Sequence, residues 1–131
     1  MGKKIMDRAL IFGAGASFYS LIETLWRGWT HWTMSITGGL VLLTVYALDR
    51  KSRLPLWKRC LRSAGVITIY EFLVGCIVNL RLHWQVWDYS ARPGNLLGQV
   101  CPLFCLLWVL LSLPILGLCR LFRRNMEPEL K

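Results

Sequence analysis

The hydrophobic residues of the chain gather in long blocks that are separated by short polar stretches. Each block approaches the roughly 17–25 residues that an α-helix needs to cross about 30 Å of hydrocarbon. The blocks show neither the strict alternation of a β-strand nor the short amphipathic runs of a soluble core. The sequence therefore predicts an all-α, polytopic membrane protein with four transmembrane helices, at about Ala9–Trp26, Trp32–Leu48, Leu61–Leu80 and Val100–Cys119.

The polar stretches predict how these helices are connected within one integral membrane domain, residues 1–131. Residues 81–98 are polar and aromatic, which suits a segment that lies at the outer membrane interface. Within this segment, Arg92-Pro93-Gly94-Asn95 predicts a turn, because proline fixes φ and glycine or asparagine tolerates positive φ. Residues 120–131 are expected to form a tail after the last helix.

The net charge of +9 would suit nucleic-acid binding, but the positions of the basic residues argue against it. Of the 16 Lys and Arg residues, 13 lie on one side of the predicted membrane: before the first block, around the loop from the second block to the third, or after the fourth. Cytoplasmic segments carry such an excess of positive charge. We therefore expect the chain to lie in the inner (cytoplasmic) membrane with both termini on the cytoplasmic side. We also expect its basic face to contact anionic lipid rather than nucleic acid.

The sequence offers little for catalysis, metal binding or a cofactor. Cys101 and Cys105 share a helix face, but no histidine accompanies them, so we expect them to pack rather than to bind a metal. His83 and Asp88 are the one candidate acid–base pair, and a position at the membrane interface explains both. We predict that the protein is not an enzyme and has no cofactor.

Glu71 is the most informative polar residue, because it falls near the middle of the third predicted helix. A carboxylate there costs at least about 2.5–3.5 kcal/mol on insertion scales, and such residues usually have a function. Glu71 is therefore expected to bind protons, to pair with a cationic solute, or to lock two helices together by a hydrogen bond. The small and hydroxyl residues along the helices are expected to serve helix packing.

A set of polar and aromatic residues at the predicted outer ends of the helices accompanies Glu71. Glu23 and Arg27 are i, i+4 neighbours, so a local ion pair is the simplest interpretation. The alternative is that all these residues meet in one cavity that opens outward and binds an ionic or zwitterionic small molecule. The predicted ligand-binding residues are Glu23, Arg27, Glu71, Trp87, Asp88, Arg92, Asn95 and Gln99.

Several short motifs resemble the putative ABC-transporter type IV (CmpB-like) membrane protein family over roughly residues 15–115. In the second half of the chain they are Tyr70-Glu71-Phe72-Leu73-Val74-Gly75-Cys76, Val86-Trp87-Asp88-Tyr89-Ser90, Pro93, Asn95-Leu96-Leu97-Gly98-Gln99-Val100-Cys101 and Leu106-Leu107-Trp108. In the first half they are Glu23, Arg27-Gly28, Thr30-His31-Trp32-Thr33-Met34 and Gly38-Gly39. The motifs occur in the family's order, which makes the resemblance specific.

The resemblance implies a bacterial membrane protein of the ABC-transporter permease type. The chain has no Walker A motif, so an ATPase partner would be a separate protein. Four helices rarely enclose a pathway alone, so we expect a homo-oligomer or a larger membrane complex. The leading hypothesis is a permease-like transport protein that binds a small polar or charged solute in an intramembrane pocket around Glu71. The alternative is a membrane subunit or scaffold that stabilises or regulates a partner complex without transporting anything.

Overall fold

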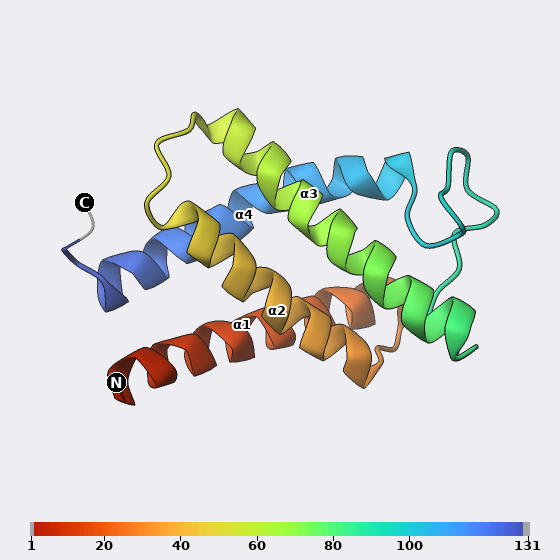
Figure 1. Cartoon of the computed structure of the whole chain (residues 1–131), viewed down its shortest axis with the longest axis horizontal. Helices are drawn as coiled ribbons and strands as arrows, with labels where there is room; N and C mark the ends of the chain where they lie inside the picture. The colour runs from red at the N-terminus through yellow and green to blue at the C-terminus, as the bar shows by residue number, and fades with distance from the viewer. Residues whose placement is uncertain (1, 130–131) are drawn as a thin grey trace. The chain divides into compact units, whose positions relative to one another are not determined.

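The computed structural model describes residues 2–129, and over that part of the chain every regular element is helical (Figure 1). In the order of the sequence, the elements are α1 (Gly2–Arg27), α2 (Trp32–Asp49), α3 (Leu56–Gly75), the π-helical segment η1 (Cys76–Arg81) and α4 (Pro102–Met126). The helix η1 continues directly from α3, so that Leu56–Arg81 forms one span of 26 residues.

Four helical spans are long and apolar enough to cross a membrane, namely α1, α2, α3 with η1, and α4. This finding confirms the predicted fold class, an all-α protein with four membrane-spanning helices. The structure contains no membrane, so the cytoplasmic position of both termini stays a prediction.

Helices α1, α3 and α4 extend beyond the apolar blocks into the basic residues that adjoin them. Helix α1 begins at Gly2 rather than near Ala9, α3 begins at Leu56, and α4 continues to Met126 through most of the predicted tail. Lysine and arginine are good helix formers, and their long side chains reach the headgroups from a helix end. Hydropathy therefore identified the apolar part of each helix, whereas the helix itself runs on through the adjoining basic residues.

Local chemistry explains the tight connection between α1 and α2. Gly28 adopts φ +83°, and its N–H donates to the carbonyl of Thr24 at 2.7 Å, which ends α1 in the way that a left-handed glycine commonly does. His31 then caps α2, because its Nδ1 accepts from the backbone N–H of Thr33 at 3.3 Å.

The chain divides into two compact units, which are described separately below. Unit 1 comprises Met1–Arg53 and Pro114–Lys131, and unit 2 comprises Leu54–Leu113. Unit 1 thus contains α1, α2 and the second half of α4, while unit 2 contains α3, η1 and the first half of α4. The prediction of a single domain stays a prediction.

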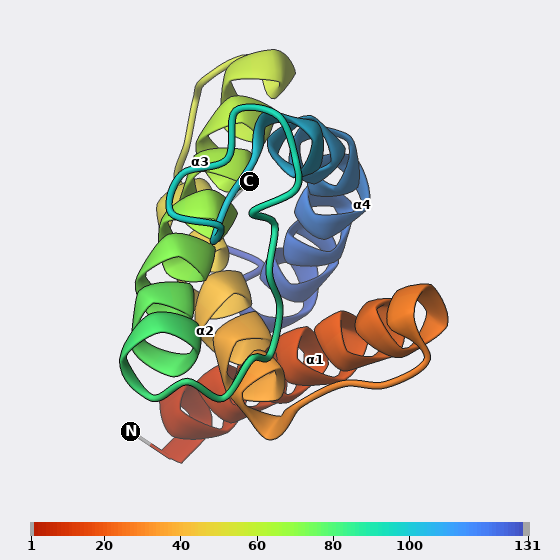
Figure 2. The same cartoon turned by 90° about the vertical axis from the view of Figure 1, so that its right-hand side faces the viewer.

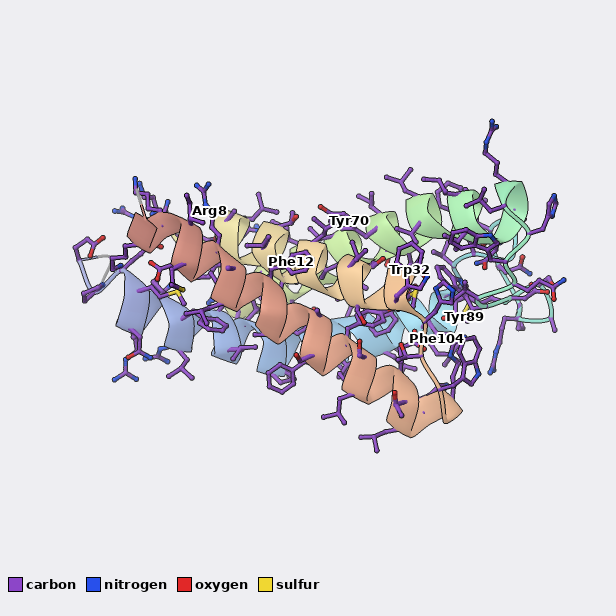
Figure 3. All side chains as sticks on the ribbon, turned by 90° about the horizontal axis from the view of Figure 1, so that it is seen from below. Arg8, Phe12, Trp32, Tyr70, Tyr89 and Phe104 are labelled. Carbon is purple, nitrogen blue, oxygen red and sulfur yellow. The ribbon has the colours of Figure 1, made fainter. Side chains whose placement is uncertain are left out.

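In unit 1, glycines bring α1 and α2 into close contact, and Figure 1 shows the two helices side by side. A Cβ atom added to Gly38 would lie 2.7 Å from the carbonyl oxygen of Gly15 and would also collide with Tyr19. The ring of Phe12, labelled in Figure 3, covers Gly39 in the same way. Small residues permit the two backbones to approach closely. The resulting van der Waals packing contributes to the attraction between helices in lipid.

The end of unit 1 at which α2 finishes is held by a charged cluster around Glu127. The hydroxyl of Tyr46 donates to Glu127 Oε2 at 2.5 Å, and Arg50 Nε donates to the same oxygen at 2.9 Å. A second nitrogen of Arg50 pairs with the other carboxylate oxygen. Lys3 Nζ donates to the carbonyl oxygen of Met126 at 2.8 Å, which ties the start of α1 to the end of α4.

The glycine contact between α1 and α2 predicts a position-dependent effect of added side-chain volume. We expect Gly38→Ala to destabilise the protein by about 1–3 kcal/mol, because the new methyl group must displace Tyr19 or the α1 backbone. Gly13→Ala is the matched control, since a Cβ there meets no atom within 4 Å and alanine favours the helix. Thermal unfolding in detergent, followed by circular dichroism, measures both; equal stabilities would contradict the contact.

The cluster around Glu127 predicts a specific loss of stability in acid. The pKa of the Glu127 carboxyl is lowered from 4.5 to about 2, chiefly by the hydrogen bond from Arg50 and also by that from the Tyr46 hydroxyl, while burial opposes the shift. Because the folded-state pKa is the lower one, the stabilisation is complete above pH 4.5 and is lost as pH falls toward 2.

We therefore expect the melting temperature of the wild type to fall more between pH 5 and pH 2.5 than that of Glu127→Gln. Replacing Glu129, an exposed acid two residues away, with Gln controls for the loss of one carboxylate. Identical acid sensitivity in the wild type and in Glu127→Gln would show that the cluster contributes nothing to folding.

Candidate functional site

Glu71 lies on α3 within unit 2, and only 3% of its surface is exposed. The indole Nε1–H of Trp108, on α4, donates to Glu71 Oε2 across a distance of 3.2 Å. One turn nearer the start of α3, the hydroxyl of Thr68 lies 3.5 Å from Cys105 Sγ, again on α4. The polar faces of the two helices therefore meet, and the buried carboxylate lies where they do.

A cluster of side-chain amides lies two turns beyond Glu71. Asn79, on η1, donates from Nδ2 to Gln99 Oε1 at 2.8 Å, and its Oδ1 accepts from the backbone N–H groups of Val86 and Trp87 at 2.7 and 3.3 Å. The indole of Trp87 in turn donates to the carbonyl oxygen of Gln99 at 3.0 Å. These bonds attach the segment that follows η1 to the end of the helix. Figure 2 shows the course of the loop between η1 and α4.

Gly75 and the π-helical turns of η1 make room for this cluster. A Cβ at Gly75 would lie 2.5 Å from Gln99 Oε1 and 2.8 Å from the Trp87 ring, so no larger residue fits there without movement. In η1, the N–H of Leu82 donates to the carbonyl of Ile77, five residues earlier, at 2.9 Å. Such wider turns are rare and occur frequently at functional sites.

A ladder of aromatic rings connects the exposed segment to Glu71. Tyr89 stacks on Phe104 with ring centroids 4.7 Å apart, and Figure 3 shows the two labelled residues together. Phe104 lies one turn before Trp108 on α4, and their centroids are 6.5 Å apart. The guanidinium of Arg92 lies 5.5 Å from the Phe104 centroid. The ladder, which comprises Arg92, Tyr89, Phe104 and Trp108, thus ends at the buried carboxylate.

Asp88 and Asn95 shape the exposed segment through local hydrogen bonds. Asp88 Oδ1 accepts from the N–H of Ser90 at 2.8 Å, and the hydroxyl and N–H of Ser90 together lower the pKa of the exposed Asp88 carboxyl. Asn95 donates from Nδ2 to the carbonyl of Arg92 at 2.8 Å and accepts from the N–H of Gly98 at 2.9 Å. The predicted turn at residues 92–95 therefore exists, and these polar groups stabilise it.

Glu23 and Arg27 form the ion pair that their spacing predicts. Arg27 Nε lies 2.7 Å from Glu23 Oε2, and the guanidinium also lies 4.3 Å from the centre of the Trp29 ring. Both residues belong to unit 1, whereas the other six predicted ligand-binding residues belong to unit 2. A single cavity formed by all eight residues therefore stays a prediction.

Within unit 2, the six predicted residues fall into three places. Glu71 lies in the span, Trp87 and Gln99 lie buried in the amide cluster, and Asp88, Arg92 and Asn95 lie in the segment before α4. Asn79, on which the cluster centres, was not among the predicted site residues, and no partner was predicted for Trp108. The i, i+4 spacing of Phe104 and Trp108 could have predicted that these two rings of the ladder share one helix face.

The described residues offer no preformed metal site, since residues 2–129 contain no group of three His, Cys, Asp or Glu side chains placed to hold an ion. What unit 2 offers instead is a buried carboxylate, a neutral hydrogen-bond donor and a row of aromatic faces. This combination suits an organic cation or a zwitterion, because carboxylates pair with cationic groups and aromatic faces attract them.

The family model described as putative ABC-transporter type IV matches residues 8–127, which is nearly the whole chain and includes three of the four spans and most of the first. The chain belongs to this family. No curated protein and no solved structure matches it.

Membership of the type IV family and the four apolar helices together identify a multi-pass membrane protein related to ABC transporters. The match also covers every residue of the amide cluster, the aromatic ladder and Glu71. These features therefore belong to the family domain and not to an appended segment.

The amide cluster predicts that Asn79→Ala loosens the segment that follows η1. The variant leaves two backbone N–H groups and Gln99 Oε1 without their partner, and such groups cost about 1–3 kcal/mol when buried. Hydrogen–deuterium exchange should become faster across residues 82–99. Asn125→Ala is the control, because Asn125 makes an exposed bond to the Leu121 carbonyl. Unchanged exchange across residues 82–99 would contradict the anchoring role of Asn79.

Proposed function

We propose that the protein is a permease-like transport protein of the bacterial inner membrane, and that Glu71 binds a small solute that carries positive charge. Family membership supports the relation to transport. The observation that carries the proposal is the burial of Glu71 in the α3 span with Trp108 as hydrogen-bond donor. The proposal includes no enzymatic step.

The identity of the donor supports a functional carboxylate over a purely structural one. An indole N–H is neutral, so it stabilises a carboxylate by a hydrogen bond without bringing a positive charge to it. A carboxylate within a membrane span is costly, and pairing with a cationic solute lowers that cost. We therefore infer that Glu71 is the group that a cationic solute contacts.

The aromatic ladder supports the solute class. A cation that approaches from the segment before α4 would meet the faces of Tyr89, Phe104 and Trp108 in turn. Each face attracts positive charge, by roughly 0.5–1 kcal/mol at an exposed site and more when water is excluded. Arg92, which now lies beside Phe104, occupies the position that a solute cation would take.

We further propose the topology and partners that transport requires. The distribution of basic residues supports cytoplasmic termini. Four spans per chain favour a homo-oligomer or a larger membrane complex, surrounded by lipid, and a separate ATPase would supply energy because the chain has no Walker A motif.

The second candidate function is that of a non-transporting subunit that stabilises or regulates a partner complex. The exposure of α1 favours it, since only Ile11 and Gly15 of that helix are buried. The two functions differ in what the purified chain does alone, because only the permease-like protein binds a solute at Glu71.

The test is solute binding by the purified chain, because uptake would require the separate ATPase. The probes are tetramethylammonium, betaine and acetate. The readout is the fluorescence of Trp108, which is obtained by subtracting the signal of Trp108→Phe from that of the wild type. We expect a response to the cation or the zwitterion but not to acetate. Glu71→Gln should weaken this response at least tenfold while circular dichroism and melting stay unchanged.

Glu129→Gln is the matched control, since it removes an exposed carboxylate outside the spans. A response that survives Glu71→Gln would remove Glu71 from the binding site. The absence of any response to the three probes would favour the subunit function instead.

A further inference from the structure

A shallow groove of about 330 Å³ lies between α3 and α4 at the end of unit 2 where α3 begins. Its lining is entirely apolar and comprises Leu56, Trp57, Cys60, Leu61, Val109, Leu110 and Leu113. No polar side chain faces the groove to satisfy a peptide backbone, so an extended polypeptide would leave its polar groups unpaired there. An unbranched hydrocarbon chain has no such groups and fits.

The first turn of α3 lies at the mouth of this groove and offers a site for an anion. Pro55 precedes the helix in an extended conformation and makes no side-chain capping bond. The first N–H groups of a helix have no partner within it, and they carry the positive end of the helix dipole. Phosphate binds readily at such a place.

Basic side chains surround the same turn. Lys58 is exposed, with Nζ 5.4 Å from the centre of the Trp57 ring, and Arg59 follows it. At about 100° per residue, Lys58 and Arg59 lie on opposite sides of the helix stripe that lines the groove. The sequence contains no acidic residue between Asp49 and Glu71, so no carboxylate of this segment opposes an anion.

Trp57 marks this turn as the level of the lipid headgroups. Its side chain belongs to the groove lining, yet 62% of its surface is exposed. Indole rings favour the membrane interface, where the ring meets hydrocarbon and the N–H meets polar groups. The position of Trp57 therefore predicts that the apolar groove starts at the level of the acyl chains and that the basic turn lies at the level of the phosphates.

We propose that this end of unit 2 is a binding site for one anionic phospholipid. One acyl chain occupies the groove, while the phosphate binds the first N–H groups of α3 and the ammonium of Lys58. The inference is independent of the proposed function, since it involves neither Glu71 nor the aromatic ladder.

The experiment uses the full chain in nanodiscs of phosphatidylcholine, into which phospholipid with brominated acyl chains is titrated. Bromine quenches tryptophan on contact, and the difference between wild type and Trp57→Phe isolates the signal of Trp57. We expect brominated phosphatidylglycerol to quench Trp57 at a mole fraction about fivefold lower than brominated phosphatidylcholine does, because one basic residue near the membrane gives a preference of that size.

Two pairs of variants test the two parts of the site. Lys58→Gln should abolish the preference for phosphatidylglycerol, whereas Lys51→Gln, an exposed lysine in the preceding loop, should keep it. Cys60→Phe fills the groove and should reduce quenching by both lipids, whereas Leu106→Phe, on an exposed face of α4, should not. Equal quenching by the two lipids would overturn the proposal, and so would equal effects of Lys58→Gln and Lys51→Gln. Both lysines are exposed, so these two variants test the proposal even if Cys60→Phe does not fold.

Discussion

Hydrocarbon offers no hydrogen-bond partner, so a polar group within a membrane span must find its partner in the protein. Hydroxyl groups solve this locally, as Thr37 does by donating to the carbonyl of Thr33, and Ser112 to that of Trp108. A side-chain amide or a carboxylate has more hydrogen-bonding positions than one backbone carbonyl of its own helix can satisfy. Asn79 and Glu71 therefore require partners on other segments, and those partners determine how unit 2 is built.

The same constraint explains why the four helices were predictable and their ends were not. An apolar block must be helical in lipid, and hydropathy marks its length. At a helix end the surroundings become polar, and several basic residues there continue the helix at little cost. Arg120, Arg123 and Arg124 thus belong to α4, although their charge had suggested a tail. By contrast, the proline before α3 and the glycine after α1 are local signals that do locate an end.

The candidate site was predictable only where its contacts are close in sequence. Glu23 and Arg27 are four residues apart, and one turn of helix brings them together. Trp108 and Glu71 are 37 residues apart, and Asn79 and Gln99 are 20 apart, so neither contact follows from spacing on one helix. The cost of a buried carboxylate indicated that Glu71 needs a partner. It did not indicate which of the seven tryptophans would be that partner.

The contacts of unit 2 also separate the groups that fix the structure from those that remain adaptable. Trp87 and Gln99 donate and accept within the amide cluster, so a solute would have to replace bonds that already hold the segment in place. Glu71 differs, because the donor to its carboxylate is a single neutral indole on another helix. Arg92 and Tyr89 contact Phe104 through ring faces, which another cation can occupy without breaking a hydrogen bond. If the proposed function is correct, a cation would therefore bind along the aromatic ladder, and the hydrogen bonds of the amide cluster beside it would stay intact.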